Sequence, residues 1–463
     1  MNYDAIVIGS GQAGPFLAVR LAQSGMKVAL IEREHYGGTC VNDGCIPTKT
    51  LVASARAAHV ARRAADYGVT LQGTVGVDME AVMARKDRVV QQSVDSLTQW
   101  LRTTPGLDLV WGHARFTGPD RVEVAGRVLQ APKIFINVGG RAALPDWPGL
   151  DAVPVLTNTG MMSLDVLPQH LIVVGGSYIG LEFAQMFRRF GAQVTVLEAS
   201  DRVIAREDPE VSSEVQAILE GEGVRFVLGA AHATVQRQGD RILVACSAGG
   251  AAHEVAGSHL LAAVGRRPNT DDLGLQAAGI ATDARGFITV DDRLRTNVAG
   301  VWALGDVNGR GAFTHTAYND FEIVAANLLD GEQRSVNDRI PAYALFIDPP
   351  LGRVGMSEAQ VRAAGRPALV GVMPMSRVGR AKERGETQGF MKVLVDAQTE
   401  RILGASLLCI EGDEIVHSLL DIMAADASYR VVQRAVHIHP TVSELIPTLL
   451  GKLVPLAAHA APP

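Results

Sequence analysis

Two cysteines, Cys40 and Cys45, lie five residues apart in a chain of 463 residues that contains only four cysteines. On an ideal α-helix, five residues would separate their Cα atoms by about 8.7 Å, whereas a disulfide tolerates roughly 7 Å at most. A bond between them therefore requires a distorted backbone, which Asn42, Asp43 and Gly44 favour by their residue types. The spacing is compatible with a redox-active pair, and equally with two buried thiols that do no chemistry.

The residues that follow the pair favour a reactive thiolate. Pro47 is suited to the start of a helix, which would place Cys45 beside a helix N-terminus. The partial positive charge there lowers the pKa of a thiol, and Lys49 adds a cation within one turn. The other two cysteines, Cys246 and Cys409, lie in apolar strand-like runs and are predicted to pack in the core.

A dinucleotide-binding unit precedes the cysteines. The apolar run Ala5–Ile8 is typical of a buried parallel strand, and Gly9, Gly11 and Gly14 open an amphipathic helix after it. Such glycines allow a tight turn, the approach of backbone to a pyrophosphate, and close helix–strand packing. Glu32, at the end of the second strand, is placed to accept a ribose hydroxyl.

The same unit recurs 166 residues later. The first glycine, the glycine that ends the helix and the acidic residue have counterparts at Gly175, Gly191 and Glu198. Ser177 stands where the middle glycine would be, close to the expected cofactor pyrophosphate. Because three landmarks repeat at one offset, we expect two dinucleotide sites in one chain.

The remaining pattern predicts an α/β protein with a third, α+β domain. Helices are expected at 48–66 and 78–102, and a short strand at 287–290 where the chain returns to the first domain. The expected domains are a first dinucleotide-binding domain in two parts (1–147 and 270–340), a second dinucleotide-binding domain (148–269) and a C-terminal domain (341–463).

Composition excludes several classes of protein. The net charge of −6 gives no electrostatic reason to expect nucleic-acid or anionic-membrane partners. No apolar run reaches the length of a membrane span, and the N-terminus enters a strand without a signal-like segment. We therefore expect a soluble, cytoplasmic protein. No metal site is predicted, because the spacing of His437 and His439 alone says little.

Together the motifs resemble those of the FAD-dependent pyridine nucleotide–disulfide oxidoreductases, the family of lipoamide dehydrogenase, glutathione reductase and mercuric reductase. The resemblance covers nearly the whole chain. It rests on Gly9–Gly14 with Glu32, Gly37–Lys49, Gly175–Glu182, Val264–Asn269, Ala303–Asp306 and His437–Glu444. It implies two Rossmann-like domains, for FAD and for NAD(P), followed by a C-terminal α+β dimerisation domain.

The resemblance also implies the residues that bind the cofactors FAD and NAD(P)H. Asp306 would accept a ribityl hydroxyl, although a simple turn aspartate would fit its spacing almost as well. The full set is Gly9, Gly11, Gly14, Glu32, Thr39, Lys49, Ala114, Asp306, Thr314, Gly175, Tyr178, Ile179, Gly180, Glu198 and Gly265.

The catalytic roles follow from the same resemblance. Electrons would pass from the nicotinamide through FAD to a Cys40–Cys45 disulfide, with Cys45 the flavin-side, charge-transfer thiol and Cys40 the interchange thiol. Lys49 and Glu182 would form an ion pair near the flavin. His439, held by Glu444, would be the acid–base and would reach the disulfide of the other subunit, which implies a homodimer built mainly by residues 341–463.

The substrate stays open at this point. The segment Asp348–Arg353 resembles lipoamide dehydrogenase less than it resembles the reductases grouped near mercuric reductase, which include the reactive-chlorine-resistance copper(II) reductase. The C-terminal tail, however, lacks the paired cysteines of mercuric reductases. The alternatives are a small disulfide, a thiophilic metal ion, dihydrolipoamide as in dihydrolipoyl dehydrogenase, and a redox sensor without turnover. Glu198 favours NADH, because a carboxylate repels a 2′-phosphate; Arg202 and Arg206 would favour the phosphate.

Overall fold

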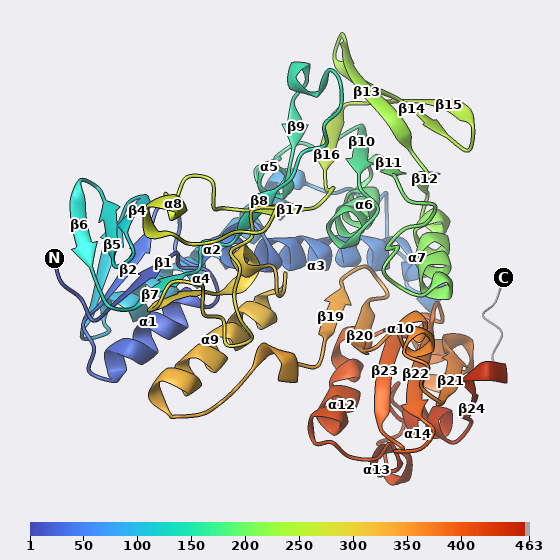
Figure 1. Cartoon of the computed structure of the whole chain (residues 1–463). Helices are drawn as coiled ribbons and strands as arrows, with labels where there is room; N and C mark the ends of the chain where they lie inside the picture. The colour runs from blue at the N-terminus through green and yellow to red at the C-terminus, as the bar shows by residue number, and fades with distance from the viewer. Residues whose placement is uncertain (459–463) are drawn as a thin grey trace.

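The computed structural model describes residues 1–458 and is built around three large sheets (Figure 1). The first is parallel throughout, in the order β18-β7-β1-β2-β3. Its central strand is buried at every residue, as the unbroken apolar run predicted. The strands are β1 (Ala5–Ile8), β2 (Val28–Glu32), β3 (Leu107–Trp111), β7 (Ile134–Ile136) and β18 (Val301–Ala303).

The second sheet repeats the first. Its order is β12-β11-β10-β16-β9, again all parallel. The strands are β9 (Val155–Leu156), β10 (His170–Val174), β11 (Gln193–Glu198), β12 (Val224–Leu228) and β16 (His259–Ala262). Four of them follow the order of β1, β2, β3 and β7, so the sequence repeat is also a repeat of topology.

Each copy also carries a three-stranded antiparallel meander between its third strand and the strand that returns to the sheet. In the first copy these are β4 (Ala114–Gly118), β5 (Arg121–Val124) and β6 (Arg127–Gln130), and in the second β13 (Ala231–Gln238), β14 (Arg241–Ala248) and β15 (Ala251–Gly257). A two-stranded ribbon of β8 (Gly140–Ala142) and β17 (Arg266–Pro268) joins the copies.

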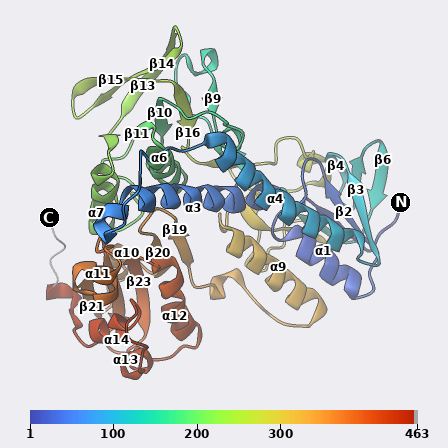
Figure 2. The same ribbon diagram turned by 180° about the vertical axis from the view of Figure 1, so that it is seen from behind.

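The long helix α3 (Cys45–Arg62) lies between the parts of the molecule and packs against two others, α4 (Met79–Arg102) and α6 (Tyr178–Phe190) (Figure 2). It differs from the expected helix 48–66: it begins at Cys45 and ends at Arg62, before a separate 3-10 turn at Ala64–Tyr67. The other helices of these two copies are α1 (Gly14–Gln23), α2 (Gly38–Asn42), α5 (Asn158–Met161), α7 (Pro209–Gly221), α8 (Leu275–Ala278) and α9 (Thr314–Leu329).

The third sheet is antiparallel and has the order β19-β20-β23-β22-β21-β24. Its strands are β19 (Ala342–Leu345), β20 (Leu351–Gly355), β21 (Ala368–Pro374), β22 (Phe390–Asp396), β23 (Ile402–Leu408) and β24 (Val454–Pro455). Helices α10 (Glu358–Ala363), α11 (Gly379–Glu383), α12 (Gly412–Ala424), α13 (Arg430–Arg434) and α14 (Leu445–Leu450) accompany it. This is the expected α+β architecture. The last five residues of the predicted 341–463 domain lie outside the residues that the structure describes.

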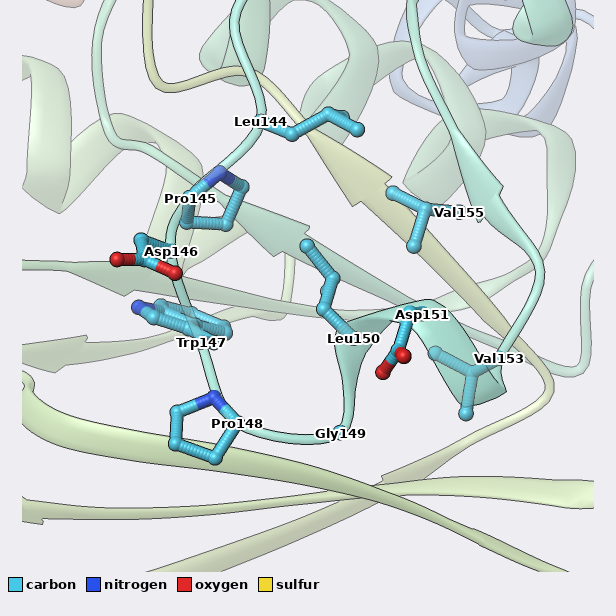
Figure 3. Close-up of a pocket in the computed structure, with 10 residues that line it drawn as sticks. All are labelled: Leu144, Pro145, Asp146, Trp147, Pro148, Gly149, Leu150, Asp151, Val153 and Val155. Carbon is cyan, nitrogen blue, oxygen red and sulfur yellow. The ribbon is translucent and has the colours of Figure 1, made fainter.

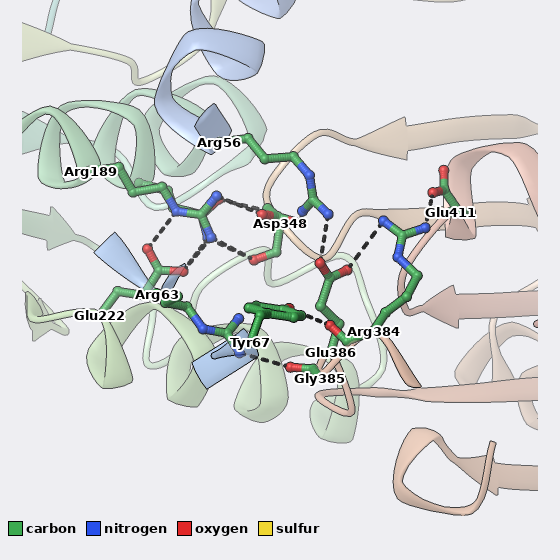
Figure 4. Close-up of polar contacts among 11 residues, drawn as sticks. Arg56, Arg63, Tyr67, Arg189, Glu222, Asp348, Arg384, Gly385, Glu386 and Glu411 are labelled. Carbon is green, nitrogen blue, oxygen red and sulfur yellow. Dashed lines mark hydrogen bonds and ion pairs between the residues drawn. The ribbon is translucent and has the colours of Figure 1, made fainter. Parts of the chain in front are cut away.

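A network of ion pairs fixes α3 to the third part of the chain (Figure 4). Arg56 of α3 pairs with Asp348 and, at 2.7 Å, with Glu386. Arg189 of α6 pairs with the same Asp348 and with Glu222, each at 2.6 Å. One aspartate, in the turn between β19 and β20, thus ties two helices to the antiparallel sheet.

The strand expected at 287–290 does not form. Ile288 makes one isolated antiparallel bridge with Thr282, and its N–H donates to Val307 O at 2.9 Å. An apolar run of four residues predicts a strand only when a neighbouring strand is available to pair with it, and here there is none beyond that bridge in residues 1–458. In the same residues, every helix is too short or too polar to cross a membrane.

Candidate active site

The backbone distortion between the two cysteines is present. Helix α2 ends at Asn42, Asp43 and Gly44 interrupt it, and α3 begins at Cys45 itself. Helix α3 therefore starts two residues before Pro47, the residue that the sequence suggested as a helix start. Cys45 occupies the first turn of an 18-residue helix, so its sulfur lies where the helix dipole favours an anion.

Both cysteines are thiols in this structure: Cys45 is exposed and Cys40 is partly buried. A hydrogen bond from the Cys40 thiol is the main cause that lowers the pKa of Cys45 to about 6. The Thr314 hydroxyl, 3.0 Å from the Cys45 sulfur, and the Lys49 ammonium act in the same direction. The same hydrogen bond, with burial, raises the pKa of Cys40. The pair is electrostatically asymmetric, and its disulfide form stays a prediction.

The Lys49–Glu182 ion pair forms, with 2.7 Å between Nζ and Oε2. It joins α3 to α6. The other oxygen of Glu182 accepts the backbone N–H of Phe346 at 3.0 Å, and the Phe346 ring centre lies 4.4 Å from the ammonium. Glu182 is buried whereas Lys49 is about one third exposed, so the cation is fixed on one side and open on the other.

The first glycine loop has the features that a pyrophosphate requires. A Cβ on Gly14 would lie 2.2 Å from the carbonyl oxygen of Gly9, so only glycine allows helix α1 to approach β1 this closely. Glu32 accepts the Ser10 N–H at 3.0 Å and its hydroxyl at 2.6 Å. Within residues 1–458, no backbone acceptor or side chain takes the loop N–H groups of Gly11, Gln12 and Ala13.

The second loop repeats this geometry. A Cβ on Gly180 would lie 2.0 Å from Gly175 O, and Glu198 accepts the Gly176 N–H at 2.6 Å. Ser177 has extended backbone angles (φ −103°, ψ −173°), which a serine adopts without strain. Its N–H and those of the first turn of α6 have no acceptor within the helix. The departure from glycine therefore leaves the shape of the loop intact.

Asp306 lies in the 3-10 turn Gly305–Asn308 directly after β18. Burial raises the pKa of its carboxyl group, and Arg266 Nε lies 3.5 Å from Oδ2. Thr314 begins α9 and is the residue that contacts Cys45. Together these groups fit FAD in the first copy: loop N–H groups and a helix start that can donate, and a partly buried Asp306 carboxylate that can accept.

Five further residues predicted to bind a cofactor lie in or near α2, β4, α6 and β16. Thr39 lies exposed in α2, and Ala114 is buried as the first residue of β4. Tyr178 and Ile179 open α6, and Gly265 follows the turn after β16 with open space around it.

Sequence reasoning missed Asn137, which follows β7. Its buried amide accepts the Gly14 N–H at 2.9 Å and donates to Leu304 O at 2.9 Å. It therefore holds the start of α1 to the end of β18. The only signal in the sequence is one polar residue at the end of an apolar run, at the edge where ligands bind parallel sheets.

His439 and Glu444 pair as expected, with 2.8 Å between Nδ1 and Oε2. The His439 side chain is 80% exposed. In the described part of the chain its side-chain hydrogen bond goes to Glu444 alone, and neither cysteine contacts it. The geometry of the His439–Glu444 pair is present, but the Cys40 and Cys45 thiols of the same chain lie elsewhere.

A cleft of about 680 Å³ lies apart from these groups, along the crossing segment that enters the second copy (Figure 3). Its walls are mainly apolar, with Leu144, Trp147, Leu150 and Val155 among the lining side chains. None of the predicted site residues lines it. Residues 1–458 contain no group of three or more His, Cys, Asp or Glu side chains arranged to hold a metal ion.

Comparison with known proteins agrees with this geometry. Residues 3–320 match the pyridine nucleotide-disulphide oxidoreductase family and residues 341–450 match its dimerisation domain. The chain is 38% identical to the probable pyridine nucleotide-disulfide oxidoreductase RclA of Escherichia coli, over 97% of this chain and 99% of that one. It is 31% identical to the dihydrolipoyl dehydrogenase of Chlamydia muridarum (96% and 95% covered) and 32% identical to a mercuric reductase of Lysinibacillus sphaericus (90% and 76%).

Solved structures give the same result. The HOCl-induced flavoprotein disulfide reductase RclA from Escherichia coli superimposes with a TM-score of 0.89 at 38% identity, over 97% of this chain and 99% of that one. A Cu(II) complex of that reductase matches equally well, at 37% identity. These matches cover both parts of the chain. The chain therefore belongs to the pyridine nucleotide-disulphide oxidoreductases, a family of FAD-containing, NAD(P)H-dependent enzymes.

Proposed function

We propose that this chain is an NADH-dependent reductase in which a Cys40–Cys45 dithiol delivers two electrons to a disulfide substrate. The observation that carries the proposal is the unequal placement of the two thiols: Cys45 begins helix α3 with its sulfur 3.0 Å from the Thr314 hydroxyl, whereas Cys40 lies partly buried in α2. The pKa of Cys45 is lowered to about 6 whereas that of Cys40 is raised. The Cys45 sulfur is thus favoured as a thiolate, and the Cys40 thiol keeps its proton until a base removes it.

Bound FAD would supply two-electron exchange between the nicotinamide and the thiol pair. Gly9, Gly14 and Glu32 would hold its pyrophosphate and ribose end, and Asp306 and Thr314 its other end. Lys49, fixed by Glu182, places a positive charge beside Cys45. That charge favours the thiolate form of the sulfur.

Thiol–disulfide exchange then proceeds in two steps. A base takes the Cys40 proton, and the Cys40 thiolate attacks the substrate disulfide, so a mixed disulfide forms and the first substrate thiolate leaves with that proton. The Cys45 thiolate attacks the Cys40 sulfur, which forms the Cys40–Cys45 bond and releases the second substrate thiol after protonation. NADH returns the pair to the dithiol and becomes NAD⁺.

The base that we assign is the partner subunit's His439. Three features support a homodimer with a site shared between subunits. The chain has the family's dimerisation domain; His439 and Glu444 form the acid–base pair away from the thiols of their own chain. Val436 and Ile438 beside them are 99% and 79% exposed, which is costly for large apolar side chains unless a partner covers them.

NADH is the cofactor that the second loop favours. The Glu198 carboxylate is fixed by the N–H groups of Gly176 and Ser200, at 2.6 and 2.8 Å, where a ribose would lie. Arg202 already donates to Ala205 O at 3.1 Å, so it would have to give up that bond to reach a phosphate.

A second candidate is reduction of a thiophilic metal ion. The support is that one relative is a mercuric reductase and that the similar Escherichia coli reductase has a Cu(II) complex. Dihydrolipoamide oxidation remains the alternative because of the dihydrolipoyl dehydrogenase relatives. A sensor without turnover would not need His439, Glu444, Lys49 and Glu182 together.

A substrate panel tests the proposal. The purified holoenzyme is assayed with NADH and NADPH against glutathione disulfide, lipoamide, Cu(II) and Hg(II), with a Cys40→Ser variant as control. We expect turnover of a disulfide with NADH that the variant loses. Turnover of a metal ion alone would replace the disulfide by the second candidate, and flavin reduction without turnover of any acceptor would favour the sensor.

A further inference from the structure

Phe346, in the turn between β19 and β20, contacts both members of the Lys49–Glu182 ion pair. Its backbone N–H donates to Oε1 of Glu182 at 3.0 Å, and its ring centre lies 4.4 Å from Nζ of Lys49. The same ammonium lies 2.7 Å from the other oxygen of the carboxylate. The lysine is thus held between a carboxylate and the face of an aromatic ring, both of which attract a cation.

The backbone that carries this ring is fixed on both sides. Leu345 and Ile347, the neighbours of Phe346, are 0% and 2% exposed and belong to one apolar cluster with side chains of α3 and α6. Asp348, in the same turn, pairs with an arginine of each of these two helices (Figure 4). The ring of Phe346 is therefore presented to the ion pair by an ordered segment of the third part of the chain.

The two charges of the ion pair act on Cys45 with opposite signs. Cys45 and Lys49 are four residues apart in α3, so they lie on one face of the helix. The hydrogen bond from Cys40 lowers the pKa of Cys45 most, and the Thr314 hydroxyl and the Lys49 ammonium add to it, whereas burial and the Glu182 carboxylate raise that pKa. Glu182 is buried and held by a backbone N–H, whereas Lys49 is about one third exposed, so of the two charges the cation is the one that can move.

We propose that Phe346 is a positioning residue of the redox site: its ring holds the Lys49 ammonium beside the Cys45 sulfur, while its backbone holds Glu182. The inference rests on the proposed function only in taking Cys45 as the thiolate beside the flavin. A substitution of the side chain keeps the backbone N–H, so it leaves the carboxylate in place. The cation then spends more of its time in solvent, and the Cys45 thiolate loses part of the stabilisation that the cation gives it.

Phe346→Leu tests the inference, because leucine is apolar but has no aromatic face. The variant is made in the Cys40→Ser holoenzyme, in which the Cys45 thiolate should give a long-wavelength charge-transfer band without reductant. Since the thiolate is stabilised less, the pH at which the band reaches half its height should rise by about 0.3–1 unit. Lys49→Met should raise that pH further. Phe346→Leu should add nothing in the Lys49→Met background, because the ring acts only through the ammonium.

Phe390→Leu is the matched control: its ring packs against the same apolar cluster and makes none of the cation–ring contacts found in residues 1–458. It should leave the half-height pH unchanged. An unchanged or lower value in Phe346→Leu, an equal rise in Phe390→Leu, or a further rise when Phe346→Leu is added to Lys49→Met overturns the inference. The readout needs no acceptor, so an enzyme that turns over no disulfide would refute the proposed function and leave this test intact.

Discussion

At the scale of single residues, the reactivity of the site lies in the unequal environments of two sulfurs. The Cys40 thiol donates to Cys45, and Thr314 and Lys49 add to the same effect, against burial and the Glu182 carboxylate. The pKa of Cys45 is lowered, so its thiolate is present above about pH 6 and is lost as the pH falls through that value.

Variants at Cys40 separate the donor from the sulfur. Cys40→Ser keeps an O–H donor and should leave a stable Cys45 thiolate, seen as a long-wavelength charge-transfer band without reductant. Cys40→Ala removes the donor, so the pH at which the band reaches half its height should be higher than in Cys40→Ser. Cys45→Ser should have no band at any pH. A band in Cys45→Ser and none in Cys40→Ser would reverse the assigned roles.

Glu198 should set the choice of nicotinamide. A carboxylate within about 4 Å of a 2′-phosphate costs on the order of 1–4 kcal/mol, so the unmodified enzyme should prefer NADH about tenfold or more in kcat/KM. Glu198→Ala should narrow this ratio by raising kcat/KM with NADPH more than it lowers that with NADH. A higher kcat/KM with NADPH in the unmodified enzyme would mean that Arg202 or Arg206 binds the phosphate.

At the scale of elements, α3 carries Cys45 at one end and is held at the other by Arg56. Burial alone would raise the pKa of Asp348, but Arg189 and Arg56 outweigh it and hold that pKa below its usual range. A carboxyl group with a lowered folded-state pKa stabilises the fold above its unfolded pKa of about 3.9, and this stabilisation is lost as the pH falls further.

Asp348→Asn should therefore be less stable at pH 7, by about 3–5 kcal/mol, because two arginines lose a buried partner. The gap in thermal unfolding midpoint between the variant and the unmodified protein should shrink below about pH 4. Asp330→Asn is the control: it breaks an exposed pair with Arg20, worth about 1 kcal/mol at most. Equal losses in the two variants would show that the network has no special role.

Sequence alone predicted the elements that depend on local pattern and repetition. The glycine loops, Glu32 and Glu198 follow from residue types at fixed spacing, and the break before Cys45 follows from Asn42–Gly44. The contacts made by Asn137 and Phe346 could not be predicted, because they join residues more than a hundred positions apart with no periodic signal. The strand expected at 287–290 failed for the same reason: its pairing depends on a neighbour that the local pattern does not show.

At the scale of the whole molecule, the described chain holds both the thiol pair and the histidine that we propose for the exchange, but keeps them apart. The thiols lie at the start of α3, and His439 lies exposed between α13 and α14. A symmetric dimer would contribute the same surface twice, so each of its two sites would take its thiols from one subunit and its histidine from the other.

Complementation between subunits tests this arrangement. His439→Gln should reduce the rate of disulfide turnover by roughly 10²–10⁴ while NADH still reduces the flavin. A heterodimer of His439→Gln and Cys40→Ser subunits has one complete site if the histidine acts across the interface, so it should recover about half of the unmodified activity. No recovery in a purified heterodimer would place the acid–base within one chain or assign it to another residue.

The central claim is that Cys40 and Cys45 form a disulfide that NADH reduces. Thiols are counted by alkylation in denaturant, in the oxidised holoenzyme and after anaerobic addition of a small excess of NADH, with mass mapping of the labelled peptides. Of the four cysteines, we predict that only Cys246 and Cys409 are labelled at first and that Cys40 and Cys45 are labelled after NADH, together with a long-wavelength charge-transfer band. Free Cys40 and Cys45 in the oxidised protein, or no gain of label when the flavin has been reduced, would contradict the claim.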